Sequence, residues 1–201
     1  MKKELKTKIT KEKILNSAIK EFGEKGYFAA KINNICSDGI SKGLLYHNYK
    51  DKDELYLACV ETIFNDITNY LKNQEINNDF EKYTKVRLKF FNENKEKASI
   101  FFEAVIKPPH ELREEIQSLK KGFDSFNEDV YDKILLSITL REGVSKIEAK
   151  EYFKLMQNAF NGYFSSPTYN DMDISDIIVE HEDKLSSMLN YMLYGIAEKR
   201  S

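Results

Sequence analysis

Apolar side chains recur along most of this chain at intervals of three and four residues, which is the spacing of one face of an α-helix. The pattern is clearest between Leu55 and Leu71, where a single apolar stripe persists over several turns. Few breakers interrupt such stripes, because only 8 glycines and 3 prolines occur among the 201 residues. No stretch alternates with the period of two that a half-buried strand requires. The sequence therefore predicts an all-α fold with about nine helices.

Helix boundaries follow from capping and turn residues. Thr10 can cap the first helix, and Gly26 stands where a glycine commonly ends one. Ser41 can cap a short third helix, and Asp51 can cap the fourth, with Glu54 three residues on. Ser145 with Glu148 makes the capping-box pattern for the eighth. The predicted helices span residues of about 11–25, 32–37, 42–49, 52–73, 80–94, 97–107, 110–141, 146–164 and 175–199.

The first three predicted helices are arranged as a helix-turn-helix unit. Two short helices separated by a tight turn at Asp38 and Gly39 occupy residues of about 32–50. In such a unit the second short helix lies in the major groove of DNA, which is just wide enough for one α-helix. We therefore expect a small N-terminal domain over residues 1–54 and a larger helical domain over residues 55–201.

The net charge of -2 conceals a difference between the two parts of the chain. Residues 1–59 hold 12 lysines, no arginine and 8 acidic residues, which gives +4, so the remaining residues carry -6. A basic N-terminal part beside an acidic remainder suggests that the basic part meets a polyanion such as nucleic acid. A split of this size also arises by chance, so charge alone leaves both interpretations open.

Composition also argues against several classes of protein. No apolar run approaches the roughly 20 residues that cross a bilayer, and the basic N-terminus has no apolar segment behind it. We therefore expect neither a membrane span nor a signal peptide. Cys36 and Cys59 match neither a disulfide framework nor a zinc pattern. The expectation is a reduced, cytoplasmic protein.

No residue pattern predicts catalysis, a cofactor or a metal. The chain has no nucleophile motif, no paired acid–base constellation and no Gly-rich phosphate loop. His110 and His181 have carboxylates beside them in sequence, but adjacent residues on a helix do not converge on one ion. We therefore expect a protein that is not an enzyme and that uses no cofactor or metal.

Residues Thr10 to Ile63 resemble the N-terminal domain of the TetR/AcrR family of transcriptional regulators. The segments TKEKILNSAIKEFGEKGY and ISKGLLYHNYKDKDELYLAC carry the resemblance. Within the second segment, the Ser-Lys-Gly-x-Leu-Tyr core from Ser41 to Tyr46, followed by Tyr49, is close to a family signature. The rest of the chain matches only in its layout of long helices. The resemblance implies a DNA-binding domain over residues 1–54, followed by a helical ligand-binding and dimerisation domain.

The third predicted helix and the start of the fourth hold the candidate DNA-binding residues. The resemblance implies that Tyr46 and Lys52 hold phosphates. It also implies that Lys42, Leu44 and His47 face the groove floor or its walls. The start of a helix beside a lysine suits a phosphate in any case, because the free N–H groups of the helix point at the anion. The complete predicted set is Lys42, Gly43, Leu44, Tyr46, His47, Asn48, Lys50 and Lys52.

Three features depart from the family pattern. The segment from Ile35 to Ser41 is one residue shorter than usual, which implies an early end of the second helix or a tighter turn. Leu44 stands where a small residue such as threonine is common, and leucine can contact a thymine methyl group but cannot hydrogen-bond a base. Asn48 stands where a larger residue is frequent. These departures imply a weak or unusual sequence preference.

The resemblance also implies an effector pocket and a dimer interface in the larger domain. Aromatic side chains with a few polar groups suit a small molecule, and the candidates are Phe101, Phe102, His110, Phe123, Phe126, Phe160 and Tyr163. The last two helices are expected to pair with their two-fold mates as a four-helix bundle. The candidate interface residues are Tyr152, Met156, Leu185, Met188, Leu189 and Met192. Packing inside one protomer is the alternative for both sets.

The sequence thus predicts a ligand-responsive transcriptional regulator. In this interpretation the protein is a repressor that binds a near-palindromic operator on double-stranded DNA as a homodimer, and an unidentified small-molecule effector releases it. The alternative is a helical interaction or adaptor protein that kept the fold but lost specific DNA binding. The shortened turn after Ile35 is the only support for that alternative.

Overall fold

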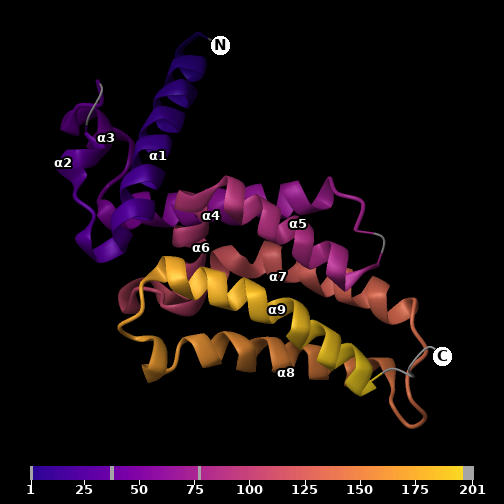
Figure 1. Cartoon of the computed structure of the whole chain (residues 1–201). Coiled ribbons are helices and arrows are strands. Elements are labelled where there is room, and N and C mark those ends of the chain that lie inside the picture. Colours follow the sequence, from indigo (N-terminus) through magenta and orange to yellow (C-terminus); the bar gives the residue numbers. More distant parts are fainter. Residues whose placement is uncertain (1, 37–38, 77, 197–201) are drawn as a thin grey trace. The chain divides into compact units, whose positions relative to one another are not determined.

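The computed structural model describes residues 2–36, 39–76 and 78–196, and helices make up most of that length (Figure 1). The all-α prediction is confirmed, because the elements within these ranges are all helical. They are α1 (Lys2–Ala29), α2 (Ile32–Ile35), α3 (Lys42–Asn48), α4 (Lys52–Lys72), α5 (Phe80–Glu93), α6 (Lys95–Ile106), α7 (Arg113–Leu136), α8 (Lys146–Phe164) and α9 (Ile174–Ile196), with short 3-10 helices at His110–Leu112 and Pro167–Tyr169.

Packing divides the chain into two compact units. The N-terminal unit comprises the described residues of 1–65 and 94–120, and so holds α1, α2, α3, α6 and the first part of α4. The C-terminal unit comprises those of 66–93 and 121–201, with α5, α8, α9 and the larger part of α7. These units describe packing, so the functional boundary expected after residue 54 stays a prediction.

α2 packs against α1 in the N-terminal unit, and each of the first three helices buries apolar side chains. Ile14, Ile35 and Leu45, one from each of the first three helices, are fully buried. The carboxylate of Glu21 accepts the N–H of Lys31 across 2.9 Å, at the start of α2. A helix start leaves N–H groups without partners inside the helix, and Glu21 satisfies one of the amides there. α1 therefore fixes the four-residue α2 by apolar contact and by hydrogen bonding.

α1 begins earlier than the sequence predicts. It starts at Lys2, so Thr10 lies inside the helix and is not its cap. Residues 2–9 are mostly Lys, Glu and Leu, which favour helices, and this composition explains the extension. The predicted break at Gly26 is confirmed, because this residue leaves the helical conformation with φ 71°. Glycine enters that region without the steric cost that a Cβ atom brings.

α1 and α6 approach each other closely at Gly23. A Cβ atom built there would lie 2.5 Å from the Cβ of Glu96 and 2.6 Å from its Cα, closer than packed atoms come. Only glycine therefore fits at this point of the contact. α6 lies far along the sequence from the helix-turn-helix, yet the two belong to the same packing unit.

Aromatic rings fill much of the core of the C-terminal unit. Tyr131 of α7 stacks on Phe153 of α8 with ring centroids 5.6 Å apart, and Phe80 of α5 contacts Phe153 at 5.4 Å. α9 packs along both α5 and α8 (Figure 1). Large rings contribute much buried apolar area per side chain, so this cluster joins α5, α7 and α8 into one core.

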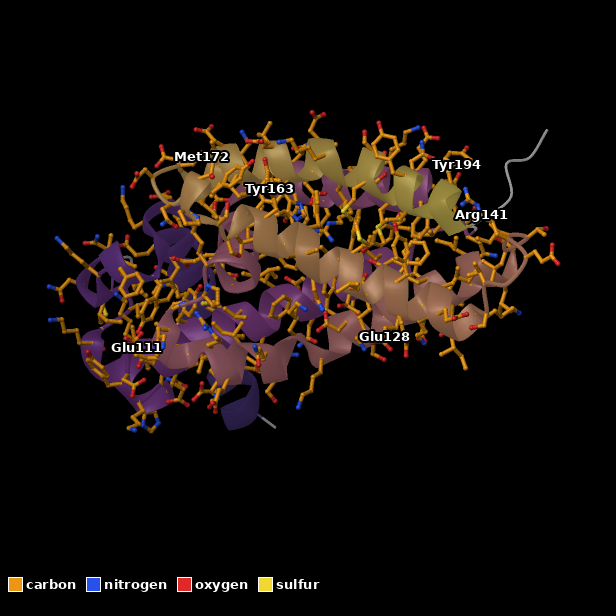
Figure 2. All side chains as sticks on the ribbon, turned by 90° about the horizontal axis from the view of Figure 1, so that it is seen from below. Glu111, Glu128, Arg141, Tyr163, Met172 and Tyr194 are labelled. Carbon is orange, nitrogen blue, oxygen red and sulfur yellow. The ribbon has the colours of Figure 1, made fainter. Side chains whose placement is uncertain are left out.

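The end of α7 differs from the prediction. The helix stops at Leu136, although the sequence predicts a helix to Arg141. Ile138 and Thr139 are β-branched, which lowers their helix propensity and accounts for the earlier end. Arg141 instead donates from Nη2 to the backbone oxygen of Tyr194 across 2.8 Å, and Figure 2 shows both residues at the same end of the C-terminal unit.

Two further boundaries can be compared with the prediction, the start of α8 and the end of α2. The capping box of α8 is confirmed, because the N–H of Glu148 donates to the Ser145 hydroxyl and the N–H of Ser145 donates to the Glu148 carboxylate. α2 ends at Ile35, earlier than residue 37. Residues 37 and 38 of the predicted turn and 197–199 of the last predicted helix lie outside the described residues.

Two structural features are absent from the part of the chain that the structure describes. None of its helices combines the length and the apolar character that crossing a bilayer requires. Its His, Cys, Asp and Glu side chains form no group of three or more that could share a metal ion.

Candidate nucleic-acid interface

α3 is fixed at both ends by local contacts. The hydroxyl of Ser41 accepts the N–H of Leu44 across 3.1 Å, so the predicted N-cap is confirmed. At the other end Tyr49 takes an extended conformation while its N–H still donates to the oxygen of Leu45. Leu45 and Tyr49 are both buried, so they anchor one side of α3 in the N-terminal unit.

The opposite side of α3 faces solvent. Lys42, Gly43 and His47 are exposed, and Tyr46 keeps 51% of its surface accessible although it is a large apolar ring. Leu44 and Asn48 are half-buried. The Asn48 amide donates to the oxygen of Leu44 across 2.8 Å, so one of its two N–H groups is used within the helix. The exposed side thus offers an ammonium, a phenol and an imidazole.

The start of α4 lies directly after α3 and has a defined geometry. The N–H of Glu54 donates to the Asp51 carboxylate across 2.9 Å, and the Glu54 carboxylate accepts the N–H of Lys50 across 2.6 Å. The prediction that Asp51 caps this helix is confirmed. The Lys50 ammonium lies 3.8 Å from Asp51 and is almost fully exposed. An exposed cation at a helix start suits an anion.

Lys52 is held more firmly than Lys50. Its ammonium lies 4.9 Å above the ring of Tyr27 and donates to the backbone oxygen of Phe28 across 3.3 Å. The hydroxyl of Tyr27 donates to the Asp53 carboxylate across 2.6 Å. Burial and then the hydrogen bond to Asp53 raise the pKa of Tyr27 to about 12, so the phenol stays protonated as a donor. Lys52 therefore has a fixed position beside the turn after α1.

The predicted turn between α2 and α3 is described only in part. Gly39 has φ 83°, as a glycine turn requires, and a Cβ atom on it would lie 3.4 Å from the Nζ of Lys13. The ammonium of Lys13 in α1 is therefore close to this turn. α2 ends at Ile35, in agreement with the early end that the shortened segment implies.

The predicted effector residues fall into both packing units. Phe101 and Phe102 are buried in α6, and Phe101 contacts the ring of Phe64 with centroids 5.5 Å apart. The candidates Phe101, Phe102 and the exposed His110 belong to the N-terminal unit, as does Phe64. The remaining candidates, in the C-terminal unit, are the buried Phe123, the half-buried Phe126 and Phe160, and the exposed Tyr163. Of the whole set, Phe160 and Tyr163 line the same groove.

A buried ion pair in the C-terminal unit was not predicted. The guanidinium of Arg87 in α5 lies 3.0 Å from the carboxylate of Glu182 in α9, and both residues are 5% exposed. His181, also buried, lies 3.1 Å from the same carboxylate through Nδ1 and 3.2 Å from the Asn161 amide oxygen through Nε2. Burial alone would lower the pKa of Arg87, but the charge of Glu182 raises it.

A second buried polar contact lies on α5. The hydroxyl of Tyr83 donates to the amide oxygen of Asn127 across 2.7 Å, and both residues are almost fully buried. The amide nitrogen of Asn127 has no partner among the described residues. A sequence signal existed, because Arg87 shares the helical spacing of the buried Phe80, Tyr83 and Phe91. A charge within an apolar stripe indicates a buried partner.

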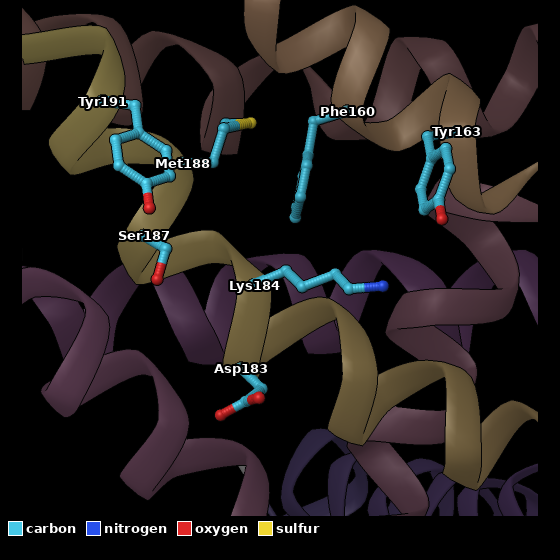
Figure 3. A pocket seen from close by; sticks show the side chains of 7 residues that line it. All are labelled: Phe160, Tyr163, Asp183, Lys184, Ser187, Met188 and Tyr191. Carbon is cyan, nitrogen blue, oxygen red and sulfur yellow. The ribbon is translucent and has the colours of Figure 1, made fainter.

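α8 and α9 leave an open groove of about 390 Å³ on the surface of the C-terminal unit. Figure 3 shows the Lys184 side chain extended along this groove toward Tyr163, with Met188 and Phe160 beside it. The Lys184 ammonium lies 5.4 Å from the Tyr163 ring centroid. The lining residues are Phe160, Tyr163, Asp183, Lys184, Ser187, Met188 and Tyr191.

The predicted dimer residues lie at different depths. Leu185, Leu189 and Met192 are buried within the protomer, where they face its own core. Tyr152, Met156 and Met188 are half-buried. The large apolar residues that α8 and α9 expose are Ile147, Leu155, Tyr163, Val179, Tyr191 and Tyr194.

Known proteins match this chain in its N-terminal part and in its fold. Residues 14–59 match the family described as "Bacterial regulatory proteins, tetR family". The biofilm operon icaADBC HTH-type negative transcriptional regulator IcaR of Staphylococcus epidermidis is 29% identical over 127 residues, which are 62% of this chain and 67% of IcaR. The HTH-type transcriptional regulator YerO of Bacillus subtilis is 39% identical over 66 residues, which are 32% of this chain and 23% of YerO.

A solved structure extends the likeness in fold to most of the chain. A transcriptional regulator from Rhodococcus sp. Rha1 has a TM-score of 0.64 at 14% sequence identity, with 94% of this chain and 99% of that chain covered. A likeness at this identity concerns the fold. The sequence match covers the helix-turn-helix helices α2 and α3, whose exposed side has just been described. Residues 14–59 are therefore similar in sequence to the N-terminal domain of TetR-family regulators, and the chain shares its fold with solved TetR-family regulators.

Proposed function

We propose that this protein is a ligand-controlled repressor that binds a near-palindromic operator as a homodimer and leaves it when a small molecule binds. The observation that carries the proposal is the two-sided α3. Leu45 and Tyr49 hold one side in the core, while Lys42, Tyr46 and His47 are exposed on the other. A helix anchored in this way can enter the major groove without unfolding its own domain.

Phosphate contacts would come from residues around the junction of α3 and α4. We assign this role to Tyr46, Lys50 and Lys52, because a phenol and two ammonium groups near a helix start are the donors that phosphate oxygens accept from. Lys42, Gly43, Leu44, His47 and Asn48 would then lie closest to the base edges. Leu44 can recognise only a methyl group there, so we expect base discrimination to rest mainly on Lys42 and His47.

The second copy would dock on the exposed face of α8 and α9. Val179 and Tyr191 on α9 are 70% and 75% exposed, which is unusual for large apolar side chains on a protomer with an aromatic core. The groove that contains Tyr191 and Met188 adds a surface that a two-fold mate could fill. Two reading helices on one dimer would meet two half-sites about one helical turn, or a multiple of it, apart.

Repression and release are the regulatory part of the proposal. The relative IcaR carries the name of a negative transcriptional regulator, which supports repression. A ligand can release DNA only if it binds the DNA-incompetent conformation more tightly than the competent one. We propose Phe123 and Phe126 as effector contacts within the C-terminal unit. The protein would act in the cytoplasm, where a bacterial operator is located.

The first test is capture of genomic fragments from the source organism by the purified protein at a low and a high salt concentration. Enrichment of one near-palindromic site would support a dimeric specific repressor and would identify the regulated gene. Sequencing of the bound fragments is the readout. Binding that has no salt dependence would contradict the phosphate contacts, because counterion release makes affinity fall steeply with salt.

Matched variants distinguish a specific role of α3 in DNA binding from a general effect of positive charge. Lys42→Ala should weaken binding to the enriched site roughly tenfold or more. Lys133→Ala removes the same charge from an exposed position on α7 and should leave the affinity unchanged. If Lys42→Ala and Tyr46→Phe both bind DNA like the unchanged protein, α3 is not the reading helix, and an adaptor role becomes the better interpretation.

A further inference from the structure

The turn that follows α1 is held by a carboxylate from α6. Both oxygens of Glu103 accept the N–H of Tyr27, at 3.0 Å and 3.2 Å. The preceding residue, Gly26, has φ 71°, and a Cβ atom on it would lie 3.1 Å from Oε1 of Glu103. The glycine therefore both makes the turn and leaves room for the carboxylate beside it.

The same carboxylate also reaches α4. The hydroxyl of Tyr56 donates to Oε2 of Glu103 across 2.8 Å. Tyr56 is fully buried, and its ring contacts those of Phe22 and Tyr27 with centroids 5.1 Å and 4.9 Å apart. Burial raises the pKa of Glu103, while the two donors and the charge of Lys52 oppose that rise. One half-buried carboxylate thus joins α1, α4 and α6 within the N-terminal unit.

The turn transmits this constraint to Lys52. Tyr27 places its ring under the Lys52 ammonium and its hydroxyl on Asp53, and the next residue, Phe28, offers its backbone oxygen to the same ammonium. An ammonium group has three N–H donors, so the bond to Phe28 leaves two for a phosphate. The position of Lys52 therefore depends on where Glu103 holds the turn.

We propose that Glu103 is a positioning residue for DNA binding, because it fixes the turn after α1 and this turn holds the Lys52 ammonium where a phosphate can meet it. The inference rests on the proposed DNA-binding function and gives α6 a defined part in it. A movement of Glu103 away from Tyr27 would loosen a phosphate contact without any change at the DNA surface itself.

The test measures binding of a fluorescent DNA duplex of fixed mixed sequence by anisotropy at several KCl concentrations. Phosphate contacts do not depend on sequence, so the probe needs no known operator. Glu103→Gln keeps the side-chain length but loses one acceptor oxygen and the charge. Glu96→Gln is the matched control, because it removes the same charge from an exposed position on the same helix.

We expect Glu103→Gln to raise the Kd roughly fivefold to tenfold and to make the salt slope shallower by about one, the value for one lost phosphate contact. Removal of an acidic charge by itself would favour DNA binding, and Glu96→Gln measures that opposite effect. Tyr56→Phe should act in the same direction as Glu103→Gln, but less strongly. Lys52→Ala combined with Glu103→Gln should have the slope of Lys52→Ala alone, because both changes remove the same contact.

Two results would overturn the inference. One is that Glu103→Gln and Tyr56→Phe melt like the unchanged protein by circular dichroism and bind the duplex like the Glu96→Gln protein. The other is an additive effect of Lys52→Ala and Glu103→Gln on the slope. If Glu103→Gln does not fold, Tyr56→Phe decides, since it removes only a hydroxyl. If the unchanged protein shows no salt-dependent binding, the proposed function itself fails, and the inference fails with it.

Discussion

The two packing units use buried charge in different ways. In the N-terminal unit the half-buried Glu103 is held by neutral donors, a backbone N–H and a tyrosine hydroxyl. In the C-terminal unit the carboxylate of Glu182 is almost fully buried and faces a full opposite charge on Arg87. Removal of one partner from a buried ion pair leaves an uncompensated charge, whereas loss of one neutral hydrogen bond costs far less. The hydrogen bonds of Glu103 can thus be lost one at a time at a small cost in stability, whereas loss of either partner of the Arg87–Glu182 pair is strongly destabilising.

The largest effect should come from breaking the ion pair. Glu182→Ala leaves the Arg87 guanidinium buried without its carboxylate, and we expect a loss of about 3–5 kcal/mol in the free energy of unfolding. Urea denaturation followed by circular dichroism measures the loss. Arg87→Met combined with Glu182→Leu should recover most of it, because apolar side chains of similar volume can replace such a pair. A single variant as stable as the unchanged protein would show that the pair carries little of the stability.

A smaller effect is expected where α1 meets α6 in the N-terminal unit. Gly23→Ala places a Cβ atom 2.5 Å from Glu96, and overpacking of this kind costs about 1–3 kcal/mol. Gly122→Ala is the matched change on α7 of the C-terminal unit, where a Cβ atom meets nothing within 4 Å. That variant should gain about 0.5–1 kcal/mol from helix propensity. Equal unfolding midpoints for the two variants would refute the close approach of α1 and α6.

The N-caps of α3 and α8 allow the two units to be compared, because both caps are serine hydroxyls. Ser41 and Ser145 each accept the N–H three residues on, so either change to alanine should cost about 1 kcal/mol. Ser41→Ala should also weaken DNA binding, because α3 begins there. Ser145→Ala should leave DNA binding unchanged at a temperature where both variants are folded. Anisotropy titrations of the two proteins with the same duplex test this difference.

The smallest expected effect is a change in the pH dependence of stability. Burial lowers the pKa of His181, so the folded protein binds this proton less readily than the unfolded chain. The stabilisation is therefore complete above the unfolded pKa of about 6.5 and declines as the pH falls below it. His181→Gln should flatten the stability profile between roughly pH 5 and 7. His47→Gln, at an exposed position, is the control, and an unchanged profile for His181→Gln would contradict the prediction.

The local parts of this structure could be predicted from the sequence. The caps of α3, α4 and α8 and the break at Gly26 depend on residues within a few positions of one another. The start of α1 was missed because a good capping residue, Thr10, stands inside a run that favours helices anyway. The exposed face of α3 follows from the same local rules, since Leu45 and Tyr49 take the buried side.

The long-range polar contacts could not be predicted in the same way. Glu103 lies 76 positions from Tyr27, and Arg87 lies 95 positions from Glu182. Periodicity shows which face of a helix is buried, but it does not show which residue of another helix lies opposite. The depth of Leu185, Leu189 and Met192 illustrates the same gap, since an apolar stripe can face its own core or a partner.

The two cysteines give the N-terminal unit a built-in reporter of its own opening. Cys59 in α4 is fully buried, and burial raises the pKa of its thiol, while Cys36 beside α2 is half-exposed. Only the thiolate reacts with alkylating reagents, so Cys59 is protected while the unit stays closed. The rate at which a thiol reagent modifies Cys59 therefore measures how often α4 opens from the core. The measurement uses the native protein and needs no added label.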